Sequence, residues 1–164
     1  MLKLVSQRKI KENWKTYKEQ VRDAMVSTDG ALAFVEGKTE ETLKGIYSRL
    51  MNPFSHQMHL WIDDDDEYLL LTHIQVCEFT ETKTLLLFSL TRTKDVDKET
   101  IIQRWVDGYP IISTFALQND CKGITAFTDL DYFVKVAKKL TKLVDKEIII
   151  RSQYYVPLLK YIPK

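Results

Sequence analysis

The chain has few of the residues that close disulfides, wrap phosphates or cross membranes. Its 164 residues include 2 cysteines, 5 glycines and 4 prolines. Cys77 and Cys121 lie far apart in the sequence, and a disulfide would require the fold to bring them together, so we expect two buried free thiols in a reducing compartment. The first residues lack the long apolar run of a signal peptide, and no segment approaches the length of a membrane span. We therefore expect a cytoplasmic protein, or one assembled from the cytoplasm into something larger.

The charge balance is nearly neutral. Lysine and arginine number 24 against 23 aspartates and glutamates, so no overall field attracts nucleic acid or an anionic membrane. The basic stretches 9–11 and 135–142 alternate with apolar residues, which is typical of solvated helix faces. With 45% hydrophobic residues, a chain of this length buries one sizeable core. The sequence predicts a single domain over residues 1–164, with no nucleic-acid and no membrane partner.

Apolar residues three and four positions apart, each series following a capping residue, predict the helices. Ser6 is expected to cap the first helix and Thr39 the second. A third helix opens at Asp97, and Pro110 should kink it or split it in two. A fourth begins at Asp129. The apolar stripe of the first helix is Ile10, Trp14, Tyr17, Val21 and Met25.

Short apolar runs between these helices predict strands. The acidic residues 63–66, between the first two strands, indicate a solvated hairpin turn. The leucine-rich run 85–88 indicates a central strand buried on both faces, and the strand after Cys121 is also expected to be buried. The element order ααβββαβαβ predicts the α/β (α+β) class, with a single mixed sheet and helices on both faces. The expected strands are residues 58–62, 67–79, 84–90, 121–127 and 147–155.

This order resembles the fold of the GCN5-related N-acetyltransferases (GNAT), and most closely the small GNAT-like proteins of tailed bacteriophages. Residues 58–62 and 69–74 look like their central hairpin. Residues 85–90 followed by the helix 97–118 resemble their cofactor-binding strand and helix, and 120–127 is similar to the strand that follows an Asp-Cys turn. The resemblance covers most of the chain and implies acetyl-CoA as the cofactor of the family's enzymes.

The turn between the cofactor strand and its helix departs from the family pattern. In the enzymes it reads Arg/Gln-x-x-Gly-x-Gly/Ala, and its amides hold the pyrophosphate; here residues 92–97 contain no glycine. Asp95 and Asp97 place negative charge where phosphates would lie, which weakens binding by roughly tenfold or more. If the cofactor binds, the resemblance assigns its contacts to Leu90, Arg92, Lys94 and Asp97.

Acetyl transfer to an amine needs a base for the amine and an acid for the departing thiolate. On the resemblance, His73 and Glu78 are the candidate bases and Tyr132 is the candidate acid. Each also has a structural interpretation. His73 alternates with apolar neighbours as a hydrogen-bonded sheet residue does, Glu78 faces solvent near a turn, and Tyr132 fills the edge of the core.

The histidines and aspartates do not form a metal motif. His56, His59 and His73 supply three ligands at most, and neither cysteine has a ligand nearby in the sequence. Residues 63–66 lack the alternating ligands, glycine and terminal glutamate of a calcium loop. We expect no metal site.

Two functional hypotheses follow, with an unrelated small adaptor as a third. The first is a GNAT-like domain that has lost acetyl-CoA chemistry, uses no cofactor, and acts as a binding or assembly protein such as a bacteriophage virion or accessory component. It would reside in the host cytoplasm or the virion. Its protein partner or second copy would dock on the apolar C-terminal segment, with residues 157–164 as the candidate docking tail. The alternative is an acyl-CoA-dependent N-acetyltransferase with an atypical pyrophosphate loop.

Overall fold

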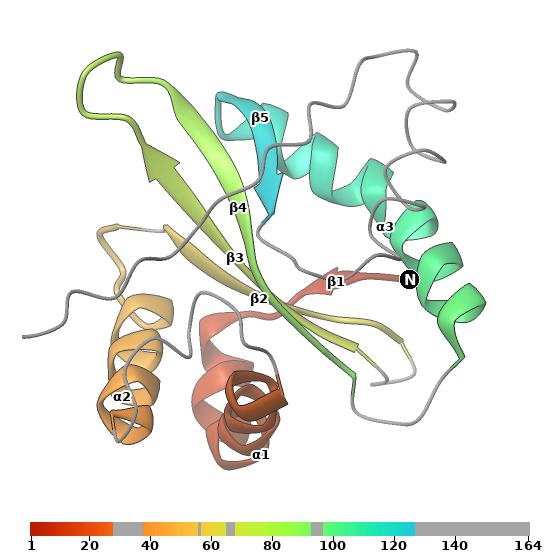
Figure 1. Cartoon of the computed structure of the whole chain (residues 1–164). Helices are drawn as coiled ribbons and strands as arrows, with labels where there is room; N and C mark the ends of the chain where they lie inside the picture. Colours follow the sequence, from red (N-terminus) through yellow and green to blue (C-terminus); the bar gives the residue numbers. More distant parts are fainter. Residues whose placement is uncertain (28–37, 56, 65–67, 93–96, 127–164) are drawn as a thin grey trace, which may run out of the picture.

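A single mixed sheet organises the chain. The computed structural model describes residues 1–27, 38–55, 57–64, 68–92 and 97–126. The strands lie side by side in sequence order, the first four antiparallel and the last parallel to its neighbour, as Figure 1 shows. This confirms the predicted mixed sheet. The strands are β1 (Lys3–Leu4), β2 (Met58–Ile62), β3 (Tyr68–Val76), β4 (Lys83–Arg92) and β5 (Cys121–Ala126).

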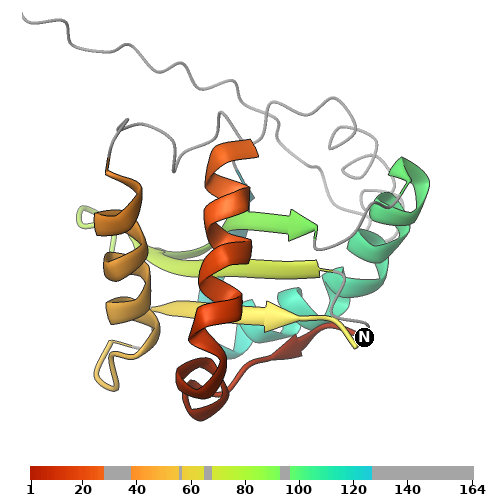
Figure 2. The same cartoon turned by 90° about the horizontal axis from the view of Figure 1, so that it is seen from below.

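Helices cover both faces of the sheet. Helices α1 (Gln7–Ser27) and α2 (Thr39–Leu50) pack on one face, and α3 (Lys98–Gln118), the crossover from β4 to β5, packs on the other (Figures 1 and 2). The first face buries one apolar cluster, which includes Ile10, Val21, Leu43, Leu60 and Leu71. The α3 face buries a second, which includes Trp61, Leu70, Leu85, Ile112 and Ala116.

The predicted helix boundaries are right in two of three cases. The Ser6 hydroxyl accepts a hydrogen bond from the Lys9 amide at 3.3 Å, and Asp97 caps α3, as expected. The prediction for Thr39 is wrong: Lys38 occupies the cap position without a side-chain bond, and Thr39 is the first helical residue. A cap position requires a non-helical backbone, which Thr39 does not have.

Pro110 does not split α3. The helix runs from Lys98 to Gln118, and its core residues Ile112 and Ala116 lie beyond the proline. The hydroxyls of Ser113 and Thr114 donate to the Pro110 carbonyl oxygen at 3.1 and 2.7 Å. Packing of α3 on the sheet outweighs the backbone hydrogen bond that a proline cannot donate.

At one edge the sheet has a short strand, β1, that the sequence pattern does not predict. Strand β1 pairs Lys3 with Ile62 and Leu4 with Trp61, and two residues are too few to show an alternating pattern. Strand β5 was expected to be buried, but only Cys121 is, and the residues after it are half-buried or exposed.

The expectation of two buried thiols is wrong for Cys77. Strand β3 ends at Val76, and the chain then turns, with the Glu81 amide donating to the Cys77 carbonyl oxygen at 2.8 Å and Glu81 at φ 53°. Cys77 therefore lies in an exposed turn, while Cys121 is buried, and both thiols are free.

The acidic turn 63–66 was expected to be solvated, and for its first residue this is wrong. Asp63 is only 6% exposed; its Oδ1 accepts from the Tyr68 amide at 3.2 Å, and its Oδ2 lies 3.7 Å from the Arg104 guanidinium. Asp64 is exposed and bonds to Lys3 and to the N-terminal amine, which lowers the pKa of its carboxyl to about 2. The turn thus ties the sheet to α3 through Asp63.

Some predictions fall outside the described residues. These are the helix from Asp129, Tyr132, the strand 147–155 and the tail 157–164. Within the described residues, no helix combines the length and apolarity required to cross a bilayer. In the same part of the chain, no three histidine, cysteine, aspartate or glutamate side chains gather closely enough to hold a metal.

Gly45 allows a test of which side of α2 faces the solvent. It lies on the exposed side of α2, and an added Cβ would meet nothing within 4 Å. Alanine loses less backbone entropy than glycine in a helix, so Gly45→Ala is expected to stabilise the fold by about 0.5–1 kcal/mol. The midpoint of thermal unfolding should rise by about 2–4 °C per kcal/mol for a chain of this size. A lower midpoint would show that Gly45 is packed against a neighbour.

Candidate functional site

The candidate site lies where β4 ends and α3 begins. Strand β4 pairs with β3 as far as Arg92, which lies opposite Tyr68, and Leu90 lies opposite Leu70. The parallel ladder with β5 runs from Lys83 to Leu87. The backbone therefore brings two predicted cofactor residues, Leu90 and Arg92, to the end of β4 from which α3 departs, while Lys94 lies outside the described residues.

An irregularity interrupts β4 four residues before its end at Arg92. Leu71 of β3 pairs with Ser89, but the next residue, Thr72, pairs with Leu87, so Phe88 is an extra residue in β4. A bulge of this kind leaves one residue outside the ladder and redirects the backbone around it. It directly follows Leu87, the last β4 residue of the ladder with β5. The middle of β4 thus has a backbone shape that a regular central strand does not have.

The N-terminus of α3 is capped by the chain's own carboxylate. Asp97 Oδ1 accepts from the amides of Glu99 and Thr100, both at 3.0 Å, and its Oδ2 accepts from the Thr100 hydroxyl at 2.6 Å. The bond from the Thr100 side chain is the largest cause of the lowered pKa of Asp97, which favours its charged form. These first-turn amides are the groups that bind an anion at a helix N-terminus. Here Asp97 already occupies two of them.

His73 lies on β3 near the bulge. It pairs with Met58 and Leu86 and is half-buried. Burial lowers the pKa of its imidazole, and the Arg49 guanidinium lowers it further. Both effects favour the neutral form of the imidazole.

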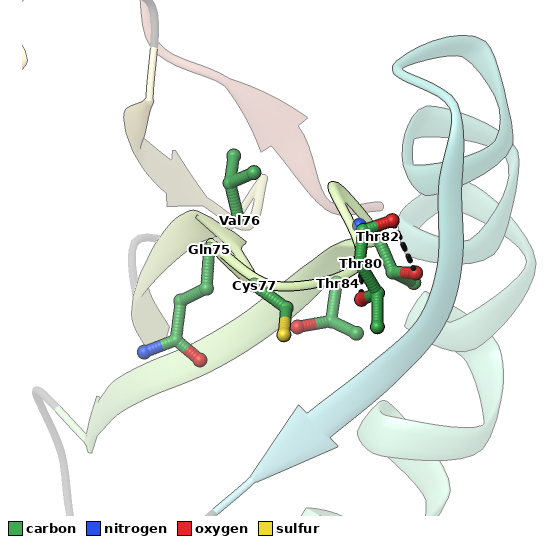
Figure 3. Close-up of a pocket in the computed structure, with 6 residues that line it drawn as sticks. All are labelled: Gln75, Val76, Cys77, Thr80, Thr82 and Thr84. Carbon is green, nitrogen blue, oxygen red and sulfur yellow. Dashed lines mark hydrogen bonds between the residues drawn. The ribbon is translucent and has the colours of Figure 1, made fainter.

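Glu78 and the β3–β4 turn lie at the other end of the sheet. A hollow of about 480 Å³ opens there, shown in Figure 3 with its lining residues and the hydrogen bonds between Thr80 and Thr82. Thr84 in its lining is eight residues from Arg92, roughly 25 Å along a strand at about 3.3 Å per residue. Glu78 is exposed in this turn, so the structure does not bring it together with Asp97. The hollow also contains Cys77, whose pKa is lowered chiefly by a hydrogen bond with the Thr80 side chain.

Sequence reasoning missed two features of this region. The bulge at Phe88 has no signature because the run 85–88 is uniformly apolar, and only the pairing with β3 reveals the extra residue. The burial of Asp63 was missed because four consecutive aspartates indicate a solvated turn, and Arg104, its partner, is distant in sequence.

Solved structures share the fold of this chain, although no protein-family model and no curated protein matches the sequence. A possible acetyltransferase from Clostridium difficile 630 has a TM-score of 0.60 at 10% identity over 97% of both chains. A GNAT family acetyltransferase from Staphylococcus aureus has 0.56 at 11% identity, over 97% of this chain and 98% of its own. AAC(6')-Iy in complex with the bisubstrate analogue CoA-S-monomethyl-acetylneamine has 0.54 at 9% identity, over 97% and 98%. The chain therefore has the fold of GNAT acetyltransferases, as the sequence predicted.

Proposed function

We propose that the chain is an acyl-CoA-dependent N-acetyltransferase with an atypical pyrophosphate contact. The observation that carries this proposal is the bulge at Phe88, directly after the last β4 residue of the ladder with β5. It is supported by the similarity to acetyltransferases along nearly the whole chain, one of which is complexed with a CoA-containing analogue. A backbone amide that a bulge directs out of the ladder is the type of group that stabilises a developing oxyanion on a thioester carbonyl.

The cofactor fits the two parts of the site unequally. In the second half of β4, the bulge at Phe88 and the backbone from Leu90 to Arg92 would hold the thioester arm of acetyl-CoA, which supplies the acetyl group when bound. At the start of α3, Asp97 competes with the pyrophosphate for the amides of Glu99 and Thr100. We infer that affinity comes mainly from the β4 end and that the pyrophosphate contributes less than it does with a glycine-containing turn.

The chain's own proton acceptor in this proposal is His73. The attacking amine must lose a proton, and a neutral imidazole takes it. Burial keeps His73 neutral at pH 7, and its place on β3 beside the bulged part of β4 sets it near the proposed reaction centre. Asp97 has a positioning role through its cap on α3 and does not take part in proton transfer.

The proposal is tested by measuring thiol release from acetyl-CoA with and without an amine. The acceptors are a polyamine, the aminoglycoside sisomicin and a peptide with a free N-terminus, and each product is identified by mass spectrometry. Cys77→Ser serves as the background protein, because the exposed Cys77 thiol can itself be acetylated. We expect amine-dependent thiol release that persists in Cys77→Ser and falls in His73→Gln. Release that is independent of any acceptor, or unchanged in His73→Gln, would contradict the assignment.

The lowered pKa of His73 also predicts how the stability of the fold depends on pH. The pKa of His73 in the folded chain lies below the ordinary value of 6.5. Between these two pKa values the unfolded chain binds more protons than the folded chain. The free energy of unfolding therefore falls as the pH is lowered from 6.5 through the pKa of the folded chain. We expect the imidazole resonances to titrate below pH 6.5 in NMR, and His73→Gln to flatten the pH dependence of unfolding in that window. A midpoint at or above 6.5 would remove the argument for His73 as a neutral base.

The second candidate function is a retained fold without acetyl transfer. The specific observation in its favour is the Asp97 cap, which occupies the anion-binding amides of α3. Such a protein would act in binding or assembly, for example as a bacteriophage component with residues 157–164 as its docking tail. A folded chain that binds no acetyl-CoA and elutes with a stable partner or second copy would favour this function.

A further inference from the structure

A second cavity lies under α3, on the opposite side of β3 from β4. It has a volume of about 430 Å³, within the usual range of small-molecule pockets. Its walls come from the first half of α3, from the turn after β2, from the start of β3 and from the N-terminal segment. Two of its residues, Tyr68 and Leu70, pair with Arg92 and Leu90 of β4, so it is one strand away from the candidate site.

The lining is mainly apolar, with a buried charge at one end. Leu70 and Ile112 form part of the apolar wall and are each 2% exposed. At the charged end, the Asp63 carboxylate is 6% exposed and the Arg104 guanidinium lies 3.7 Å from its Oδ2. Asp107, one turn further along α3, adds a second carboxylate to the lining and accepts from Gln103 at 2.8 Å.

The charge of the lining favours a cation. Asp63 and the exposed Asp107 contribute two negative charges, and Arg104 contributes one positive charge. Met1 is also part of the lining, but its N-terminal amine is paired with Asp64 at 2.7 Å. A ligand with an ammonium group would balance the remaining carboxylate, whereas an acid would add a like charge next to two others. The buried position of Asp63 makes a hydrogen bond to it stronger than one to an exposed carboxylate.

We propose that this cavity binds a small organic amine, with an apolar body against Leu70 and Ile112 and an ammonium head at Asp63 and Asp107. The site does not depend on acetyl transfer, since none of its lining residues belongs to the proposed catalytic or cofactor-binding set. Gly108 of α3 lines the cavity, and a Cβ added to it would lie 3.7 Å from Cδ2 of Leu2, another lining residue, so a larger side chain at this position takes up space in the cavity.

The test compares hexylamine, 1-hexanol and hexanoate by isothermal titration calorimetry at pH 7. We expect hexylamine to bind at least about tenfold more tightly than 1-hexanol, the ratio typical of one charge-assisted hydrogen bond, and hexanoate to bind more weakly than either. Asp63→Asn keeps an oxygen for the Tyr68 amide and should abolish the preference for the amine. Gly108→Leu should abolish binding of both hexylamine and 1-hexanol.

Matched variants separate the cavity from general effects. Gly45→Leu places the same side chain on α2, where nothing lies within 4 Å, and Asp23→Asn makes the same change at an exposed site on α1. Both should bind hexylamine as the original chain does. Equal affinities for hexylamine and 1-hexanol, a preference that survives Asp63→Asn, or no saturable binding would each overturn the proposal. Because Gly108→Leu adds volume without removing a charge, it tests the cavity even if Asp63→Asn does not fold.

Discussion

Replacing Asp97 by serine is expected to tighten the binding of CoA by about tenfold or more, because it removes a negative charge from the place of the pyrophosphate. Serine still caps a helix, so the amides of Glu99 and Thr100 keep a neutral partner that a phosphate can displace. Asp95→Gly combined with Asp97→Ala restores the spacing of the family motif after Arg92 and should tighten binding further. Dissociation constants from calorimetry measure the effect.

Pantetheine is the control ligand for Asp97→Ser, because it is the thiol-terminated arm of CoA without the pyrophosphate. Its affinity should not change in Asp97→Ser if the carboxylate acts only on the phosphates. Thermal unfolding of Asp97→Ser and Asp97→Ala separates capping from charge, since only alanine removes the cap. Equal gains for CoA and pantetheine, or no gain for CoA, would show that Asp97 does not face the cofactor.

The second large effect is expected for Leu71→Ala. Leu71 is 0% exposed at the centre of β3, within the cluster under α1 and α2, and its partner Ser89 borders the bulge. Truncating a fully buried leucine removes its transfer free energy and leaves a cavity, at a cost of about 3–5 kcal/mol. The free energy of unfolding in urea should fall by that amount.

Leu117→Ala is the matched control, since it makes the same chemical change at a residue that is 72% exposed on α3. We expect its free energy of unfolding to stay within about 0.5 kcal/mol of the original value. A similar loss of stability in the two variants would contradict the structure, in which Leu71 is buried and Leu117 is exposed.

Much of the fold could be predicted because its signals are local. The predicted strand 58–62 has the bounds of β2, and α3 begins directly after Asp97, where the sequence predicts that a helix opens. Strand β1 could not be predicted, because its two residues acquire a strand conformation only by pairing with Trp61 and Ile62. The residue type of Thr39 favours a cap position, but α2 already begins at Thr39, one residue earlier than that position requires.

The candidate site was only partly predictable, for a different reason. The absence of glycine and the acidic cap at Asp97 are properties of the sequence itself, and the structure places that carboxylate on the α3 amides. The bulge at Phe88 and the pair of Asp63 with Arg104 depend on contacts between distant segments, so no local pattern could show them. The burial of His73, which lowers its pKa, likewise depends on the helices packed above β3.

The most direct test of the proposed function is calorimetric titration of the folded chain with acetyl-CoA up to millimolar concentration. We expect saturable binding at one site with a dissociation constant of about 1 mM or lower. CoA should displace the bound acetyl-CoA, and Asp97→Ser should bind it more tightly. The absence of binding heat from both the original chain and Asp97→Ser, with thermal unfolding showing that both are folded, would contradict the proposed function. The end of β4 would then have the shape of a cofactor site without its function.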